Sequence, residues 1–223
     1  MSGAATHPAA DRFWPHPRAL LIDAMGTLFG LRESVGLTYA AVAAGHGLSL
    51  HPPALDRAFA AAYGSAPPLA FPGLGGQDLE RAERAWWAAR IDTVLEQLGV
   101  GSGTPALHRD LFDRFAEPDL WQVYAEVPAT LDRWRGQGLR LAVVSNFDQR
   151  LEPLLEALDL RRWFDVVVIS SRAGAAKPSP RPFLLALEQL QISAAEAWHI
   201  GDSPADATGA RAAGLPCVLV KRP

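Results

Sequence analysis

Cysteine is almost absent from this chain of 223 residues, in which Cys217 is the single one. A lone cysteine cannot form a disulfide within the chain, so the sequence suits a reducing compartment and predicts a cytoplasmic location. Cys217 lies in the apolar run 216–220, which favours a small buried side chain over a reactive thiol.

Long apolar runs and dense basic clusters are lacking as well. No stretch of about 18 apolar residues is present to cross a bilayer, and the N-terminus lacks the charged-then-apolar order of a signal peptide. The net charge is −3, and the longest basic clusters hold two residues, too few to mark a nucleic-acid surface. We expect neither a nucleic-acid nor a membrane partner, and no heptad pattern indicates an oligomeric state.

The sequence is rich in apolar residues, with 49% hydrophobic and 20% charged side chains, which suits a globular unit with a sizeable core. Segments with helical spacing separate the later apolar runs. Such alternation predicts an α/β fold with a parallel sheet. Five short runs are predicted as its buried strands: Ala19 to Ile22, Leu139 to Val144, Val166 to Ile169, Ala197 to Ile200 and Pro216 to Val220.

An insertion separates the first predicted strand from the second, because about a hundred residues lie between them where a βαβ crossover needs about thirty. Helical patterns at roughly 33–45, 53–63, 78–98 and 107–117 indicate a small helical domain. We therefore predict a loose tail at 1–17, an α/β core formed by 18–30 and 122–223, and a helical domain at 31–121.

Polar groups follow the predicted strands at the edge where an open α/β sheet binds its ligands. Taken singly, each is an ordinary turn former, helix cap or surface charge. Their shared position at the ends of successive strands favours a functional site. The candidate residues are Asp23, Ser145, Asn146, Lys177, Asp202 and Asp206.

Read in order, the segments 23–29, 145–146, 176–180 and 201–206 resemble the four motifs of the haloacid dehalogenase (HAD) superfamily. The segments 138–148 and 177–183 more closely resemble the family called haloacid dehalogenase-like hydrolase domain-containing protein 3. The resemblance implies a Rossmann-like parallel five-stranded sheet, the HAD core, with an inserted helical cap of the first type. It also implies a phosphatase acting on a small phosphorylated molecule.

The resemblance further implies roles for these residues. Asp23 would attack phosphorus and become an aspartyl-phosphate. Lys177 would neutralise the phosphoryl charge, while Ser145 and, less firmly, Asn146 would bind its oxygens. The implied cofactor is Mg²⁺, held by carboxylate and carbonyl oxygens. The implied metal-binding residues are Asp23, the Met25 backbone carbonyl, Asp202 and Asp206. Asp206 would either bind the metal directly or hydrogen-bond to a residue that does.

Met25 departs from the superfamily pattern, which usually has an aspartate there as general acid and base. Such help is typically worth about 10² to 10⁴ in rate, or about 3 to 6 kcal/mol of barrier. The backbone carbonyl is present whatever the side chain, so we predict retained magnesium binding with slow turnover. Substrates with good leaving groups, such as aryl or acyl phosphates, would suffer least.

Two alternatives stay open. The segment 23–29 also resembles the first motif of the 2-haloacid dehalogenases, which use no metal and normally have an aromatic residue where Met25 stands. A non-catalytic binding protein would also fit the missing acid and the tryptophans Trp86, Trp87 and Trp121. His199 is predicted to be a core histidine, and His46 to lie in a bend that ends a helix of the insertion.

Overall fold

A five-stranded parallel sheet forms the centre of the protein in the computed structural model, which describes residues 16–222. The strand order is β5-β4-β1-β6-β7, and every pairing is parallel. In β4, five of six residues are buried, as expected for a strand covered on both faces. The strands are β1 (Ala19–Ile22), β4 (Arg140–Ser145), β5 (Val166–Ile169), β6 (Ala197–Gly201) and β7 (Cys217–Leu219).

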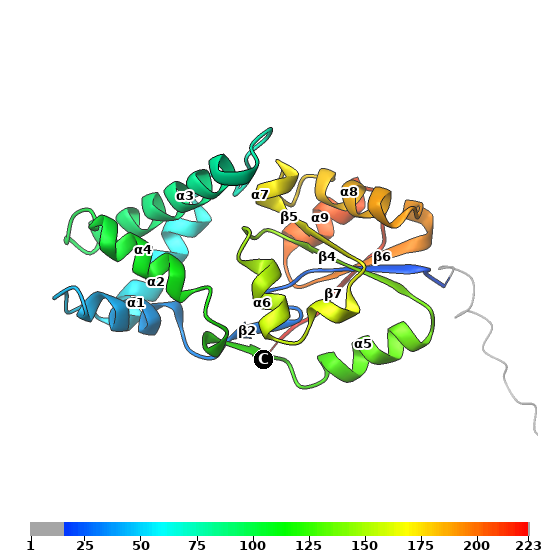
Figure 1. The fold of residues 1–223 in the computed structure, drawn as a ribbon, viewed down its shortest axis with the longest axis horizontal. Coiled ribbons are helices and arrows are strands. Elements are labelled where there is room, and N and C mark those ends of the chain that lie inside the picture. The colour runs from blue at the N-terminus through cyan, green and yellow to red at the C-terminus, as the bar shows by residue number, and fades with distance from the viewer. Residues whose placement is uncertain (1–15, 223) are drawn as a thin grey trace, which may run out of the picture.

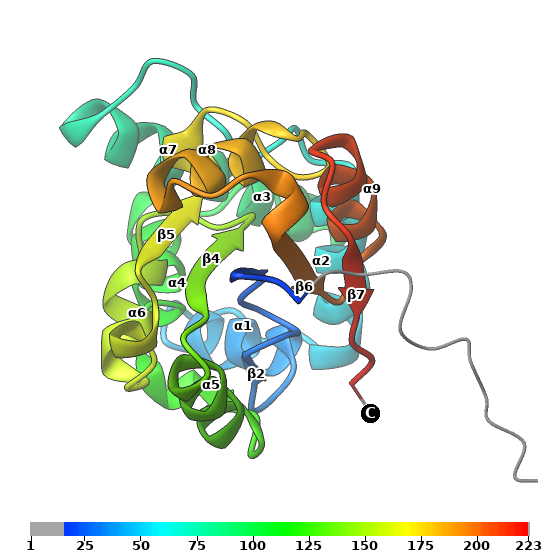
Figure 2. The same cartoon turned by 90° about the vertical axis from the view of Figure 1, so that its right-hand side faces the viewer.

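Helices cover both faces of this sheet (Figures 1 and 2). Leu20, Ile22 and Leu141 pack into one core with α5 (Val127–Gly136) and α6 (Leu151–Ala157). Alternate side chains, such as Leu21 and Val144, pack into a second core with α8 (Arg181–Leu190) and α9 (Pro204–Ala212). The two-residue period of a strand sends successive side chains to opposite faces, which explains the two cores. Beside the second core lie α7 (Ser170–Ala173) and the 3₁₀ turn η3 (Ala194–Glu196), whereas the 3₁₀ turn η2 (Arg161–Trp163) packs into the first core through Trp163.

The four helices of the insertion form a separate layer with a hydrophobic core of its own (Figure 1). The Ser34 and Thr104 side chains cap the N-termini of α1 and α4, and each supplies an acceptor for an otherwise free backbone N–H. The helices are α1 (Val35–Ala44), α2 (Pro52–Gly64), α3 (Gly76–Gln97) and α4 (Pro105–Arg114), followed by the 3₁₀ turn η1 (Pro118–Leu120).

A two-stranded antiparallel ribbon joins this layer to the sheet. It pairs β2 (Phe29–Leu31) with β3 (Trp121–Val123), and the Phe29 and Trp121 rings meet edge to face at 5.5 Å. This ribbon was not predicted from the sequence. The limits given there for the insertion, 31 and 121, fall inside its two strands, so the domain division stays a prediction.

The predicted α/β class and parallel five-stranded sheet are confirmed. The predicted ranges 19–22 and 166–169 match β1 and β5. β4 is shifted by one residue, β6 is longer by one residue at its end, and β7 is shorter by one residue at each end. The predicted loose tail, 1–17, lies almost wholly outside the described residues. Within residues 16–222, no helix is both long and apolar enough to span a membrane.

Candidate active site

The candidate site lies where the three central strands end. The register pairs Ile22 with Val143 of β4 and with Ile200 of β6, so residues beyond these positions emerge at one edge of the sheet. Asp23 follows β1 directly, and its backbone N–H donates to the Ile200 carbonyl at 2.8 Å. Because Ser145 ends β4 and Asp202 follows β6, parallel pairing brings three of the predicted residues together.

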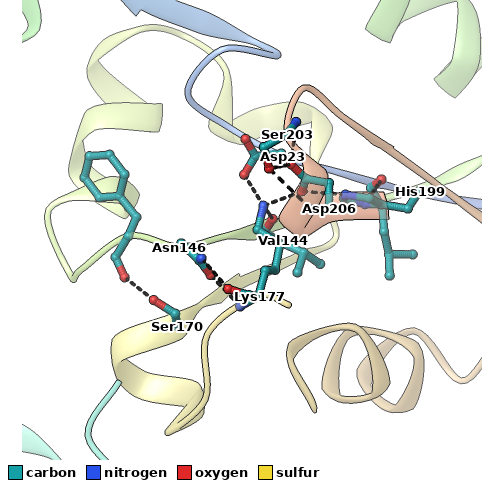
Figure 3. A network of polar contacts seen from close by, with 10 residues as sticks. Asp23, Val144, Asn146, Ser170, Lys177, His199, Ser203 and Asp206 are labelled. Carbon is teal, nitrogen blue, oxygen red and sulfur yellow. Dashed lines mark hydrogen bonds and ion pairs between the residues drawn. The ribbon is translucent and has the colours of Figure 1, made fainter. Parts of the chain in front are cut away.

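Lys177 is the buried cation of the site (Figure 3). Its Nζ donates to Asp23 Oδ1 at 2.5 Å, to Asp206 Oδ1 at 2.6 Å and to the Val144 carbonyl at 3.0 Å. These contacts use all three protons of the ammonium group. Burial alone would lower the pKa of Lys177, but the carboxylates of Asp23 and Asp206 raise it above its ordinary value. The site thus holds a fixed positive charge beside Asp23.

Asn146 holds the backbone of Lys177 in place. Its Oδ1 accepts from the Lys177 N–H at 2.7 Å, and its Nδ2 donates to the Lys177 carbonyl at 2.9 Å. This double contact indicates a positioning role. Asn146 also lines the cavity at the site. Its predicted contact with a substrate stays a prediction.

Asp206 is fully engaged by the protein. Its Oδ1 accepts from Lys177 and lies 2.8 Å from His199 Nε2, and its Oδ2 accepts from the Ser203 N–H and hydroxyl at 3.1 and 2.5 Å. Burial alone would raise the pKa of Asp206, but the hydrogen bond with His199 and the charge of Lys177 hold it well below its ordinary value. Of the two options given by the sequence analysis, this geometry favours a partner over a direct metal ligand.

His199 is a core histidine, as predicted. The side chain is completely buried, with Nδ1 2.9 Å from the Leu21 carbonyl and Nε2 on Asp206. Its ring meets Phe183 edge to face at 4.8 Å. His46 lies in the helical layer, where its Nε2 is 3.0 Å from Asp110 Oδ2, so it takes no part in this site.

A divalent cation fits the acidic group at the sheet edge. Asp23, Asp202 and Asp206 each offer one oxygen, and the three atoms lie within 4.8 Å of one another. Carboxylate oxygens are the ligands that Mg²⁺ prefers. Partial burial and the negative charges of Asp23 and Asp206 raise the pKa of Asp202 above its ordinary value. Since Asp202 is exposed, its carboxylate is the one most open to an incoming ion.

Gly26 permits the close approach of Asp202. Its φ is +85°, and a Cβ on it would overlap the Asp202 carboxylate. Gly26→Ala should therefore lower the free energy of unfolding by about 1–2 kcal/mol from left-handed strain and also displace Asp202. Gly138→Ala is a matched control, because its φ is +80° with nothing within 4 Å. Thermal melts and Mg²⁺ titrations of both variants would test this, and equal Mg²⁺ binding by the two would contradict it.

A cavity of about 390 Å³ lies between the sheet edge and the helical layer. Asp23, Ser145, Lys177 and Asp202 line its polar end. Met25 also lines it, with 49% of the residue exposed. All of the predicted site residues lie on this one cavity, and their predicted catalytic and metal-binding roles stay proposals.

A buried pair at the cavity wall was not predicted from the sequence. The Arg150 guanidinium donates to Asp148 at 2.8 and 2.6 Å and to the Phe112 carbonyl of α4 at 2.7 Å. Trp87 of α3 donates from Nε1 to Asp148 Oδ2 at 2.6 Å. These bonds tie the segment after β4 to the helical layer. Two opposite charges two and four residues after Asn146 were the signal available in the sequence.

Comparison with known proteins finds a matching family and relatives that cover most of the chain. Residues 17–214 match the haloacid dehalogenase-like hydrolase family. Haloacid dehalogenase-like hydrolase domain-containing protein 3 of Bos taurus is 42% identical over 210 residues, which cover 92% of this chain and 82% of that protein. A phosphoglycolate phosphatase of Shigella boydii is 33% identical over 159 residues, or 66% of this chain and 63% of that protein.

The fold is also that of a solved structure, a putative HAD-hydrolase of Bacillus subtilis bound to magnesium. Its TM-score is 0.70 at 18% identity, covering 92% of this chain and 87% of that one. The resemblance inferred from the four motif segments is confirmed by the family match and by the relatives. The chain belongs to the haloacid dehalogenase-like hydrolases.

Proposed function

We propose that the protein is a Mg²⁺-dependent phosphohydrolase that acts on a small phosphorylated molecule through an aspartyl-phosphate at Asp23. The observation that carries this proposal is the Lys177 ammonium held 2.5 Å from Asp23 Oδ1 at the polar end of the cavity. A fixed cation there offsets the repulsion between an attacking carboxylate and an anionic phosphoryl group. The phosphoglycolate phosphatases among its relatives support the same reaction class.

The residues divide the reaction into two displacements. Lys177 occupies Asp23 Oδ1, which leaves Oδ2 to attack phosphorus. The bond from phosphorus to the leaving oxygen then breaks, and that oxygen keeps the electron pair. Water next attacks the aspartyl-phosphate, the bond to Asp23 breaks, and the proton of the water passes to solvent. Ser145, which is 3% exposed at the end of β4, would donate a hydrogen bond from its hydroxyl to a phosphoryl oxygen.

The metal site fits the same scheme. Asp23, Asp202 and the Met25 carbonyl would hold Mg²⁺, with Asp206 supporting the site through Lys177 and Ser203. When bound, Mg²⁺ supplies positive charge that lowers repulsion at the phosphoryl group. Because the Met25 side chain has no acidic proton to give to the leaving group, an alkoxide would leave slowly, whereas an aryloxide departs without help. We therefore propose slow turnover of alkyl phosphates.

Hydrolysis of para-nitrophenyl phosphate tests the proposal. The natural protein should release para-nitrophenol with Mg²⁺ and lose this activity with a chelator. Asp202→Asn should reduce the Mg²⁺-dependent rate at least about tenfold, because it removes a charged ligand. Asp159→Asn is the control, since Asp159 is an exposed aspartate outside the cavity. Unchanged hydrolysis and metal binding in Asp202→Asn would refute the proposal.

Asp202 should also make Mg²⁺ binding depend on pH. Mg²⁺ binds the ionised carboxylate, and the pKa of Asp202 is raised by partial burial and by neighbouring carboxylates. Affinity should therefore fall as the pH drops through this raised pKa, earlier than for an ordinary aspartate near 3.9. Calorimetric titrations between about pH 7 and pH 4 would show this. An affinity that stays constant to about pH 4 would contradict it.

Thermal stability gives an independent readout of the same carboxylate. Mg²⁺ at 100 times its Kd should stabilise the protein by about 2.7 kcal/mol, or about 5–10 °C in Tm for this chain length. Asp202→Asn should lose this gain. Its metal-free form should be no less stable than the parent, because a carboxyl whose pKa is raised by folding costs stability as the pH rises through that pKa.

A further inference from the structure

We infer that the substrate is a phosphate ester of an apolar, ring-containing alcohol or phenol, whose body lies in the part of the cavity formed by the helical layer. This inference rests on the proposed function and names its substrate class. We call that part of the cavity the aromatic chamber. Its wall comes from all four helices of the layer and from the segment after α4, through Val35, Phe59, Trp87, Ile91, Leu111 and Phe115.

Aromatic rings dominate this wall. Phe59 stacks on Tyr63 at 5.8 Å with an angle of 16° between the rings, and Tyr39 meets Phe59 and Phe115 at 5.8 Å each. Flat apolar groups pack well against such surfaces, both through burial and through stacked or edge-to-face contacts. A ligand rich in hydroxyl groups would lose its hydration there and find few partners.

The charges on the cavity wall also argue against a second anionic group on the substrate. Among the described residues that line the cavity, the acids and Lys177 lie at the sheet edge, and Arg150 is the cation next to the chamber. Its guanidinium is already bonded to Asp148 and to the Phe112 carbonyl. It also lies over the Phe112 ring at 3.8 Å and the Trp87 ring at 5.1 Å. A carboxylate or second phosphate in the chamber would therefore meet a cation whose charge Asp148 already offsets.

Tyr39 gives the chamber a buried polar contact. The residue is 3% exposed and lines the cavity, and its hydroxyl forms no hydrogen bond within residues 16–222. Burial raises the pKa of Tyr39 above its ordinary value, partly offset by the Arg150 charge, so the phenol stays neutral and can donate one hydrogen bond. Tyr63 also lines the cavity and carries a second hydroxyl, so an apolar body with few acceptors matches this wall best.

The position of Met25 leads to the same substrate class by a separate argument. Its side chain lines the cavity where the superfamily usually has an acid. A leaving group that needs no proton is therefore favoured, and a phenol departs as an aryloxide far more readily than an alcohol departs as an alkoxide. Chamber shape and leaving-group chemistry thus favour aryl esters.

Three aryl phosphates test the inference in the natural protein with Mg²⁺: phenyl phosphate, 1-naphthyl phosphate and 4-carboxyphenyl phosphate. The second ring should lower KM about tenfold, as expected from the added apolar area. The carboxylate makes the leaving group better, so chemistry alone would favour the third ester. We expect instead that its kcat/KM is at least tenfold below that of phenyl phosphate, because the chamber rejects the charge.

Two phenylalanine variants locate the effect. Phe59→Ala removes a ring of the chamber and should bring the KM ratio of phenyl to 1-naphthyl phosphate toward one. Phe71→Ala is the matched control, because Phe71 also lies in the inserted segment but does not line the cavity. An equal change of this ratio in both variants would contradict the inference.

The outcomes separate this inference from the proposed function. If the three esters have similar kcat/KM values, the aromatic chamber does not select substrates, while the phosphatase proposal stands. If none is hydrolysed but 1-naphthyl phosphate quenches the tryptophan fluorescence far more strongly than 4-carboxyphenyl phosphate, the chamber is a binding site and the phosphatase proposal fails. Absence of both hydrolysis and selective quenching would refute both.

Discussion

Lys177→Met is expected to lower the free energy of unfolding of the metal-free protein by about 3–5 kcal/mol. Removing one partner of a buried ion pair leaves the remaining charge uncompensated, which costs about this much. In this protein the ammonium bonds two carboxylates, Asp23 and Asp206, which are 5% and 1% exposed. With Asp202 nearby, the variant would hold three carboxylates and no adjacent lysine.

Urea unfolding in chelator would measure the loss, and Lys221→Met is its matched control. Lys221 is the only other lysine of the chain, and it is exposed. Adding Mg²⁺ should restore part of the stability of Lys177→Met by supplying positive charge, while hydrolysis of para-nitrophenyl phosphate stays low because Asp23 has lost its partner. A loss below about 1 kcal/mol would contradict the electrostatic account of the site.

The sheet edge could be predicted because two simple rules apply to it. Buried parallel strands appear as short apolar runs, and their carboxyl ends meet at one edge. Asp23, Ser145 and Asp202 each end or follow such a run, so their meeting followed from the order of the strands. Lys177 lies farther from its strand, and its place depends on the Asn146 side chain that binds its backbone.

The ribbon of β2 and β3 could not be predicted in the same way. Each strand has three residues, and about ninety residues separate the two. A run this short has no readable period, and its pairing depends on where the helical layer returns the chain. The hydrogen-bond partners of Asp206 could not be predicted for the same reason, since Lys177 and His199 belong to other segments of the chain.

The wall of the aromatic chamber shows a further limit of sequence reasoning. Trp86 and Trp87 are neighbours on α3, and one helical step turns them about 100° apart. Trp86 is 9% exposed and donates to the Pro67 carbonyl, whereas Trp87 lines the cavity and donates to Asp148. Composition alone predicts an apolar packing role for both. Only the packing of α3 against the segment after β4 separates them.

Met25→Asp is expected to raise kcat for alkyl phosphates by about 10² to 10⁴, the usual worth of general acid–base help. Met25 lies two residues after Asp23 and lines the cavity, and at 49% exposure a carboxyl group there would remain partly solvated. The added negative charge beside Asp23 and Asp202 costs some stability, and solvent limits that cost.

The gain should depend on the leaving group, and this dependence distinguishes acid catalysis from a general change in the site. Hydrolysis of para-nitrophenyl phosphate should rise less than about tenfold, since its leaving group needs no proton. Met25→Asn, which has a similar shape to Met25→Asp but no titratable proton, should give no gain on either class. Equal gains on alkyl and aryl esters, or a gain from Met25→Asn, would mean that the missing proton donor is not what limits turnover. A gain confined to alkyl esters would mean that the metal, Asp23 and Lys177 already form a working phosphoryl-transfer site.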